Sequence, residues 1–389
     1  MTIGTLLVVA LALRVFPRLW TITIERVGHT RIQSLDGARG LLTIWVLSYH
    51  LLMSNAVDAS GVWHAPAGAL GVLMVSGFFV APFFMLTAML FGGRLVRTGG
   101  KLEAAPFFIS RAFRLIPAYT VAVMLLVLGA FVASGFEMQV GILQLLKQIG
   151  RWMLFDFVAR YDINDVDMSV QYGVLWTLRY EIIFYATLPI IAFAQRRLKS
   201  RLLPIPVFLV LGYFMWPFLF FVAGTVAAVV VPSLTGARAR LACQILAVAG
   251  IATIVVCAMS GYTSSAMQAL LLIPIFICLA LETALVRPLR WRPLRLIGEI
   301  SYSNYVLHGA VLYLIGATIV DLAWVMQLPI VPRIGTFVVL EVAALSCALL
   351  CFLVVEQPFN RLGAKLSRRF AKVSGPAPAA AGQALAQSS

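Results

Sequence analysis

The chain has 389 residues, of which 61% are hydrophobic and only 12% charged, and its mean hydropathy is +0.96. A soluble domain contains about 45–50% apolar and about 25% charged residues, so this composition excludes an ordinary soluble protein. The formal net charge of +15 would suggest nucleic-acid binding in a soluble protein, but in a membrane protein it indicates basic loops, and we expect no nucleic acid partner.

The predicted elements begin with a short stretch, residues 2–16, whose apolar part is closely followed by Arg14 and Arg18. We expect an interfacial anchor within an N-terminal segment 1–30, because no cleavage site is evident and the stretch is short. Ten further segments approach the ~17–25 residues of a spanning helix. They are residues 38–56, 70–92, 113–134, 177–195, 203–215, 217–232, 241–259, 265–286, 299–320 and 335–356. The segment 203–215 is the weakest and is alternatively a broken or re-entrant helix, because prolines border it.

The sequence therefore predicts an all-α fold, a polytopic membrane helix bundle of about ten transmembrane helices without a fused soluble domain. The transmembrane domain would span residues 31–362. Residues 363–389 would form a cytoplasmic tail, first basic and then disordered. The five cysteines all lie in apolar runs, so we expect neither disulfides nor a zinc site.

Basic residues sort between the two sets of loops that ten alternating spans create. One set, with the N-terminal arginines, holds 25 of the 30 Lys and Arg residues. Cytoplasmic loops carry such an excess, so both termini are predicted to be cytoplasmic. The only long connection on the opposite side, about residues 135–176, contains the polar stretch YDINDVDMSVQYG and is a candidate binding loop.

A histidine lies deep in the first predicted span, SLDGARGLLTIWVLSYHLL, where His50 follows Arg39 by eleven residues. Eleven helical residues make about three turns plus 20° and rise ~16 Å, so both side chains share one face. Arg39 would lie at the cytoplasmic mouth and His50 near the midplane. Ionisable groups inside spans are functional candidates. His50 could be a general base for a hydroxyl that attacks a thioester, an acyl carrier, or a packing histidine.

The residues before this span have a local explanation as well. Asp36 can cap the helix N-terminus. Gly37 and Gly40 permit close approach of another backbone or of a ligand.

Two further groups of charged residues stand near span ends. Arg111 and Arg114 are i, i+3 neighbours on one helix face, and their guanidinium groups suit phosphate or pyrophosphate; membrane anchoring explains them equally well. Trp176 fits an interfacial aromatic belt. Glu181 begins an apolar run and needs a partner, which Arg179 could supply as a structural ion pair.

A second histidine, His308, lies about 15 Å into its own span, close to the depth expected for His50. The two histidines could line one cavity together with Ser301, Tyr302 and Tyr305, and a polar packing seam is the alternative. No metal-site spacing and no nucleotide-binding motif occurs in the sequence. We therefore expect no bound metal or cofactor.

Seven fragments follow one another along the chain: RIQSLDGARGLLTIWVLSYH, FFMLTAMLFGGRL, FFISRAFRLIPAY, LWTLRYEIIFYATLP, FLFFVAGTVAA, IGEISYSNYVLH and VVEQPFNRL. Taken in order, they resemble acyltransferase family 3, the bacterial membrane O-acyltransferases that modify polysaccharides and some antibiotics. The resemblance implies an acyl-CoA donor, commonly acetyl-CoA, on the cytoplasmic side. It implies an acceptor hydroxyl on a lipid-linked or exported glycan.

The resemblance also implies site residues. The family's arginine–ten residues–histidine element falls on Arg39 and His50, with His50 as the essential residue. Its basic pair falls on Arg111 and Arg114, and its tryptophan–glutamate element falls on Trp176 and Glu181. Where the family commonly reads FFVLSGFLI, this chain reads FFMLTAMLF, so Thr87 and Ala88 replace a serine–glycine pair.

We thus expect an O-acyltransferase of the bacterial inner membrane whose partners are acyl-CoA, a sugar acceptor and membrane lipid. The alternatives are a proton-coupled transporter or flippase with a histidine relay, and a purely structural membrane subunit. The expected roles are catalysis by His50 and Glu181, acyl-CoA binding by Arg39, Arg111 and Arg114, and acceptor binding or cavity lining by Asp36, Trp176, Ser301, Tyr302 and His308.

Overall fold

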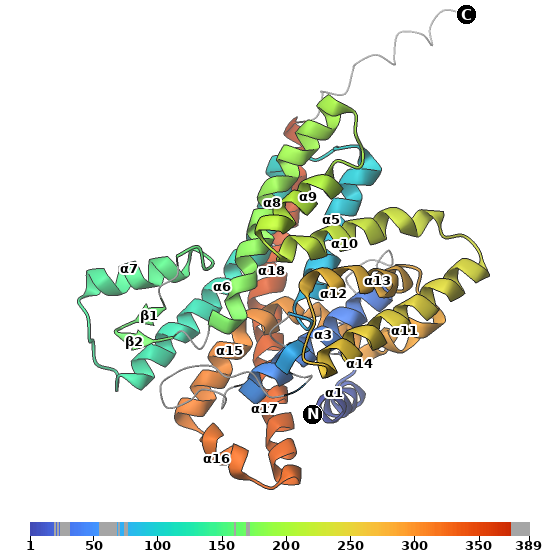
Figure 1. Cartoon of the computed structure of the whole chain (residues 1–389). Helices are drawn as coiled ribbons and strands as arrows, with labels where there is room; N and C mark the ends of the chain where they lie inside the picture. The colour runs from blue at the N-terminus through green and yellow to red at the C-terminus, as the bar shows by residue number, and fades with distance from the viewer. Residues whose placement is uncertain are drawn as a thin grey trace, which may run out of the picture.

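The computed structural model describes residues 1–18, 21, 23, 32–53, 68, 71–73, 77–158, 161–168 and 172–374. Within these residues the chain is almost entirely helical, as predicted (Figure 1). The exception is a two-stranded antiparallel hairpin formed by β1 (Asp162–Ile163) and β2 (Val166–Asp167).

The helices follow the apolar segments in chain order, with three short 3₁₀ or π elements between them. They are α1 (Thr2–Val15), α3 (Gln33–Met53), α5 (Ala81–Thr98), α6 (Ala104–Ala133), α7 (Ile142–Trp152), α8 (Tyr172–Leu198), α9 (Pro204–Phe214), α10 (Pro217–Val230), η3 (Val231–Ser233), α11 (Ala237–Met259), α12 (Ser265–Leu271), α13 (Ile273–Ala280), η4 (Ala284–Arg290), α14 (Arg292–Glu299), α15 (Ser301–Thr318), α16 (Leu322–Gln327), α17 (Ile330–Cys351), η5 (Phe352–Glu356) and α18 (Gln357–Ser374).

In the described part of the chain, four helices are long and apolar enough to cross a membrane. The count is five if the two halves of a bent pair, Ser265–Ala280 and Ala284–Arg290, form one span. These helices indicate a membrane protein, but the predicted count of ten is not confirmed. The 11-residue α9 and the 14-residue α10 are about 16 and 21 Å long, and each is shorter than the ~30 Å hydrocarbon core.

The helices α3 and α15 stand outside this set because polar residues lower their hydropathy. Those residues belong to the protein interior: His50 and His308 are buried, and so are Ser301 and Asn304. A helix that faces protein on its polar side does not need the uniform apolar surface of a lipid-facing one. The polar content of these two helices therefore identifies the inside of the molecule.

The last helices form one continuous run, Ile330–Ala371, of 42 residues. Its length of ~63 Å is about twice the hydrocarbon thickness. The second half, α18, packs along α6, where the Ser367 hydroxyl donates to the Pro106 carbonyl at 2.8 Å. The basic part of the predicted tail is thus helical up to Ser374. The part predicted to be disordered lies at 375–389, outside the described residues.

Glycines bring the start of α3 directly against η4 and α14. A Cβ atom at Gly40 would stand 1.9 Å from the Leu294 carbonyl oxygen, and one at Gly37 would stand 1.6 Å from that of Leu289. Gly298 of α14 approaches the backbone of α3 in the same way. Of the two roles considered for these glycines, the structure shows approach to another backbone.

Loops that carry basic residues meet at one end of the molecule. Figure 1 shows the ends of α5, α8 and α18 and the start of α6 gathered there. The Arg196 guanidinium donates to the Gly100 carbonyl at 3.0 Å, and the Gln195 amide donates to the Arg201 carbonyl at 2.7 Å. Two loops that were predicted to lie on the same side of the membrane are therefore in contact.

The described part of the connection over residues 135–176 is folded. It contains α7 and the β hairpin, whose turn places Asn164 and Asp165 at positive φ angles of 52° and 61°. The Asp156 carboxylate lies 3.4 Å from the Arg179 guanidinium of α8 and accepts the Tyr161 hydroxyl at 3.2 Å. This ion pair ties the connection to the start of α8.

Candidate active site

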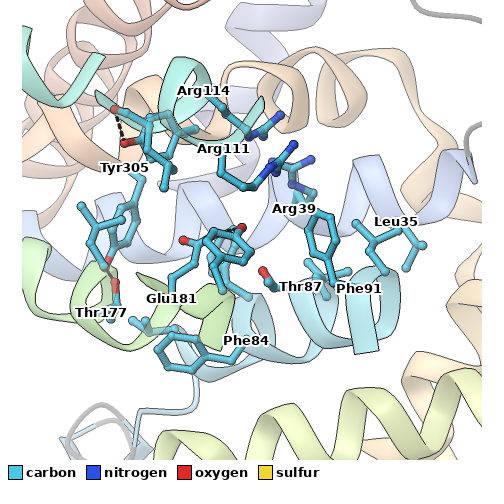
Figure 2. Close-up of a pocket in the computed structure, with 18 of the residues that line it drawn as sticks. Leu35, Arg39, Phe84, Thr87, Phe91, Arg111, Arg114, Thr177, Glu181 and Tyr305 are labelled. Carbon is cyan, nitrogen blue, oxygen red and sulfur yellow. Dashed lines mark hydrogen bonds between the residues drawn. The ribbon is translucent and has the colours of Figure 1, made fainter. Parts of the chain in front are cut away.

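Most of the predicted site residues line one cavity. It is a cavity of about 420 Å³ where α3, α5, α6, α8 and α15 converge (Figure 2). This volume falls within the ~300–1,000 Å³ of small-molecule sites. The lining residues are Ile32, Leu35, Asp36, Arg39, Val80, Phe83, Phe84, Leu86, Thr87, Leu90, Phe91, Arg111, Arg114, Leu115, Thr177, Leu178, Glu181, Tyr185, Tyr302 and Tyr305.

Three arginines give the cavity one basic wall. Figure 2 shows the guanidinium groups of Arg39, Arg111 and Arg114 gathered on the same side. The guanidinium carbon of Arg111 lies 5.0 Å from the ring centre of Phe91 and 5.9 Å from that of Tyr185. Its buried Nε has no hydrogen-bond partner in the described part of the chain. A guanidinium group that contacts two rings and keeps an unused donor is suited to an anionic ligand.

Glu181 lines the same cavity. It accepts the hydroxyl of Tyr185, one turn further along α8. The sequence left open an ion pair between Glu181 and Arg179, but the structure pairs Arg179 with Asp156 of the outer connection. Residues two positions apart on a helix point about 200° away from each other, which explains why Glu181 faces the arginines while Arg179 faces the connection.

Asp36 also lines the cavity, but the cap predicted for it is wrong. The helix α3 begins at Gln33, so Asp36 lies in its first turn instead of before it. A carboxylate in the first turn still interacts favourably with the helix dipole. Its side chain is therefore placed beside Arg39 on the same helix and on the same cavity wall.

Of the three predicted site residues at the start of α15, two line the cavity and one lies outside its lining. Tyr302 lines the cavity and donates its hydroxyl to the Leu115 carbonyl of α6 at 2.7 Å. Ser301 is buried, and it is absent from the described lining residues. Tyr305 lines the inner end of the cavity, where its hydroxyl is bonded to that of Thr177.

Trp176 supports the cavity from outside its lining. Its ring centre lies 5.7 Å from those of Tyr180 and Trp216 and 6.5 Å from that of Phe84. Phe84 lines the cavity and lies 5.1 Å from the fully buried Phe221 of α10. Trp176 and Glu181, expected to act together on the acceptor, thus occupy different surroundings.

The two predicted histidines are in contact, although they belong to distant parts of the sequence. The ring centres of His50 and His308 lie 5.0 Å apart, and both side chains are buried. The described lining residues do not include them. Tyr305 does line the cavity, and its ring centre lies 6.3 Å from that of His308. The histidine pair therefore stands one side chain behind the inner end of the cavity.

Sequence reasoning missed Glu356, a buried carboxylate at the end of the π-helical element η5. It accepts the Ser303 hydroxyl at 2.6 Å and lies close enough to Arg114 and Arg39 for the charges to interact. π-helical turns are rare in proteins overall, and those that occur are often found at functional sites. The available signal was a carboxylate at the end of an apolar run in VVEQPFNRL.

Comparison with known proteins identifies the family of the chain. The sequence model of one family, described as an acyltransferase domain, matches residues 32–355, a range that includes every cavity residue. The protein is thus a membrane acyltransferase. The chain belongs to acyltransferase family 3, which confirms the resemblance of the seven fragments.

The chain is also similar to a nodulation protein. Nodulation protein 10 of Rhizobium leguminosarum bv. viciae is 32% identical over 136 residues, which amount to 33% of this chain and 36% of that protein. The match therefore spans only about a third of the length of the relative. No solved structure matches the chain.

Proposed function

We propose that the protein transfers an acyl group, in the simplest case acetyl, from cytoplasmic acyl-CoA to a hydroxyl of a cell-surface or exported glycan. The observation that carries this proposal is the cavity in which Arg39, Arg111 and Arg114 converge. Membership of the acyltransferase family supplies acyl transfer as the reaction. The cavity supplies a reason to choose a phosphorylated donor.

The walls of the cavity fit the two ends of acyl-CoA. The nucleotide carries phosphate and pyrophosphate, which planar guanidinium groups bind through paired hydrogen bonds. The opposite wall is apolar and comes mainly from α5, including Phe83, Phe84 and Leu90. An acyl-pantetheine arm would lie along this wall, with its thioester directed to Tyr305 at the inner end.

His50 would be the base of the reaction. It takes the proton of the acceptor hydroxyl while the hydroxyl oxygen forms a bond to the thioester carbonyl carbon. The carbon–sulfur bond then breaks, and the CoA thiolate receives the proton from His50. If His50 is instead an acyl carrier, the acyl group passes first to its ring nitrogen and then to the acceptor. Glu181, held by Tyr185, would orient the donor or acceptor opposite the arginines.

The membrane setting follows from the loops. We place the protein in the bacterial inner membrane as a multi-pass protein with cytoplasmic termini, because the basic residues sort to one set of loops. The contact between two of these loops at Arg196 and Gly100 supports the sorting. The basic cavity wall would then open to cytoplasmic acyl-CoA, while the acceptor approaches the histidines from the opposite side.

The test uses inverted membrane vesicles, radiolabelled acetyl-CoA and the glycan fraction of the cell. We expect label in glycan with the wild-type protein and none above background with His50→Ala at equal expression. His64→Ala, a histidine without an assigned role, is the matched control. Full transfer by His50→Ala would refute the mechanism, and glycan flux without acyl-CoA consumption would indicate a transporter. Samples without acceptor, denatured at neutral pH and freed of acetyl-CoA, distinguish the two roles of His50, because only an acyl carrier retains label on the protein.

A further inference from the structure

A hydrogen bond to the backbone determines which ring nitrogen of His308 carries the hydrogen. Its Nδ1 atom lies 2.8 Å from the backbone carbonyl oxygen of Asn304, one turn earlier in α15. A carbonyl oxygen can only accept a hydrogen bond, so Nδ1 carries the hydrogen and Nε2 carries the lone pair. That Nε2 is buried and has no hydrogen-bond partner in the described part of the chain. An unpaired acceptor in the interior is costly, which indicates that a donor belongs opposite it.

His50 is the nearest ring that can provide this donor. The ring centres lie 5.0 Å apart with 53° between their planes. Because each nitrogen stands roughly 1.1 Å from its ring centre, facing nitrogens of these rings can approach to about 2.8 Å, an ordinary hydrogen-bond length. A turn of the His50 ring about its Cβ–Cγ bond would bring one N–H to His308 Nε2.

Two other polar groups on α15 and α17 are already bonded. The hydroxyl of Tyr305, which lies beside Thr177 in Figure 2, is bonded to that of Thr177. The carboxylate of Glu341 on α17 is buried and accepts the hydroxyls of Thr5 and Ser48. Among the described residues, the rings nearest to that of His50 are those of its chain neighbour Tyr49, at 4.8 Å, and of His308, at 5.0 Å. His308 is the one of the two that offers a buried acceptor without a partner in the described part of the chain.

We propose that His308 is the positioning residue of His50. Its Nε2 accepts the His50 N–H, which leaves the second His50 nitrogen as the base for the acceptor hydroxyl. The arrangement gives a neutral imidazole the orienting role that a carboxylate has in a Ser–His–Asp triad. This inference rests on the proposed function, in which His50 takes a proton.

The proton balance follows from this arrangement. His50 takes the hydroxyl proton as the carbon–oxygen bond forms and becomes an imidazolium, whose bond to His308 is then charge-assisted and stronger. The carbon–sulfur bond breaks, and the CoA thiolate takes the proton back from His50. His308 keeps its Nδ1 hydrogen on the Asn304 carbonyl throughout.

Two variants separate positioning from a packing role. His308→Gln places an amide oxygen near the position of Nε2 but loses the bond to Asn304. His308→Asn places an amide nitrogen near Nδ1 but loses the acceptor for His50. We expect His308→Asn to lower kcat about 100-fold, in the range of general acid–base effects, with KM for acetyl-CoA unchanged. His308→Gln should stay within about tenfold of wild type. A packing role reverses this order, because the Asn304 bond would then matter most.

A second measurement does not depend on transfer activity. Nitrogen NMR of isotopically labelled histidine, with His50 and His308 assigned by substitution, reports which nitrogen of each ring carries hydrogen. We expect His308 protonated at Nδ1, and a change in the His50 signal in His308→Asn that is smaller in His308→Gln. His308 protonated at Nε2, or a His50 signal that neither variant changes, overturns the inference. An inactive wild type with these signals present would overturn only the proposed function.

Discussion

Replacing Arg111 by alanine tests the assignment of the basic wall. The guanidinium group contacts the rings of Phe91 and Tyr185, and its Nε donor is unused in the described part of the chain. A hydrogen bond to a charged group contributes about 1.5–3 kcal/mol. If Arg111 makes one such bond to a donor phosphate, its loss raises the Kd for acetyl-CoA by about 10- to 150-fold.

The assay is calorimetric titration of detergent-purified protein with acetyl-CoA and, in parallel, with S-acetylpantetheine, which lacks the nucleotide phosphates. Arg111→Ala should weaken binding of acetyl-CoA and leave binding of S-acetylpantetheine nearly unchanged. Arg197→Ala is the control, because Arg197 is an exposed arginine over the ring of Phe193 and lies outside the cavity. For each variant, the ratio of the Kd for acetyl-CoA to the Kd for S-acetylpantetheine isolates the phosphate contribution from any change in folding.

Two results would refute the reasoning. Equal loss of affinity for both ligands would mean that Arg111 maintains the shape of the cavity. An effect no larger than that of Arg197→Ala would mean that the phosphates bind elsewhere. Arg111→Lys refines the outcome, because it keeps the charge but loses the planar pair of donors.

Three further predictions concern the fold around the site. Gly40→Ala should lower the melting temperature, since its Cβ would stand 1.9 Å from a carbonyl oxygen. The control Gly335→Ala, whose Cβ would enter open space, should stabilise its helix by up to ~1 kcal/mol. Equal shifts in melting temperature would contradict the packing of α3 on α14. Glu356→Ala should cost about 1–3 kcal/mol, because it removes the acceptor of the buried Ser303 hydroxyl, and Glu356→Gln should cost less, as measured by thermal unfolding; two unchanged melting temperatures would refute this. Asp156→Asn should speed proteolytic cleavage within 135–176, because it removes the charge partner of Arg179, while the exposed Asp165→Asn should not; identical digestion rates would count against the anchor.

Much of the candidate site could be predicted because ionisable side chains are expensive in apolar segments. That cost does not depend on the arrangement of the helices. Glu181, which begins an apolar run, is therefore a candidate from its position alone. Arg39, Arg111 and Arg114 were candidates from their spacing and from the family resemblance, and the structure brings all four to one cavity. Their roles in catalysis and binding remain predictions for the assays above.

Other features could not be predicted because they depend on direction within a helix or on contacts between distant segments. The start of α3 at Gln33 places Asp36 inside the helix, although its sequence is that of a good cap. Trp176 and Glu181 are close in sequence, yet the helix turns Trp176 towards Trp216 and away from the cavity. The number of spans is similarly undecided by hydropathy, because interior helices such as α3 and α15 carry polar residues.

The sequence by itself determined the helical membrane class, the acyltransferase family and the set of costly polar residues, since each depends on composition or on local order. Tertiary structure alone decided that His50 meets His308, that Glu356 stands beside Arg114, and that Arg179 pairs with Asp156. The physical reason is that these contacts join helices far apart in the chain. Their geometry is set by backbone packing, as where Gly40 admits the carbonyl of Leu294.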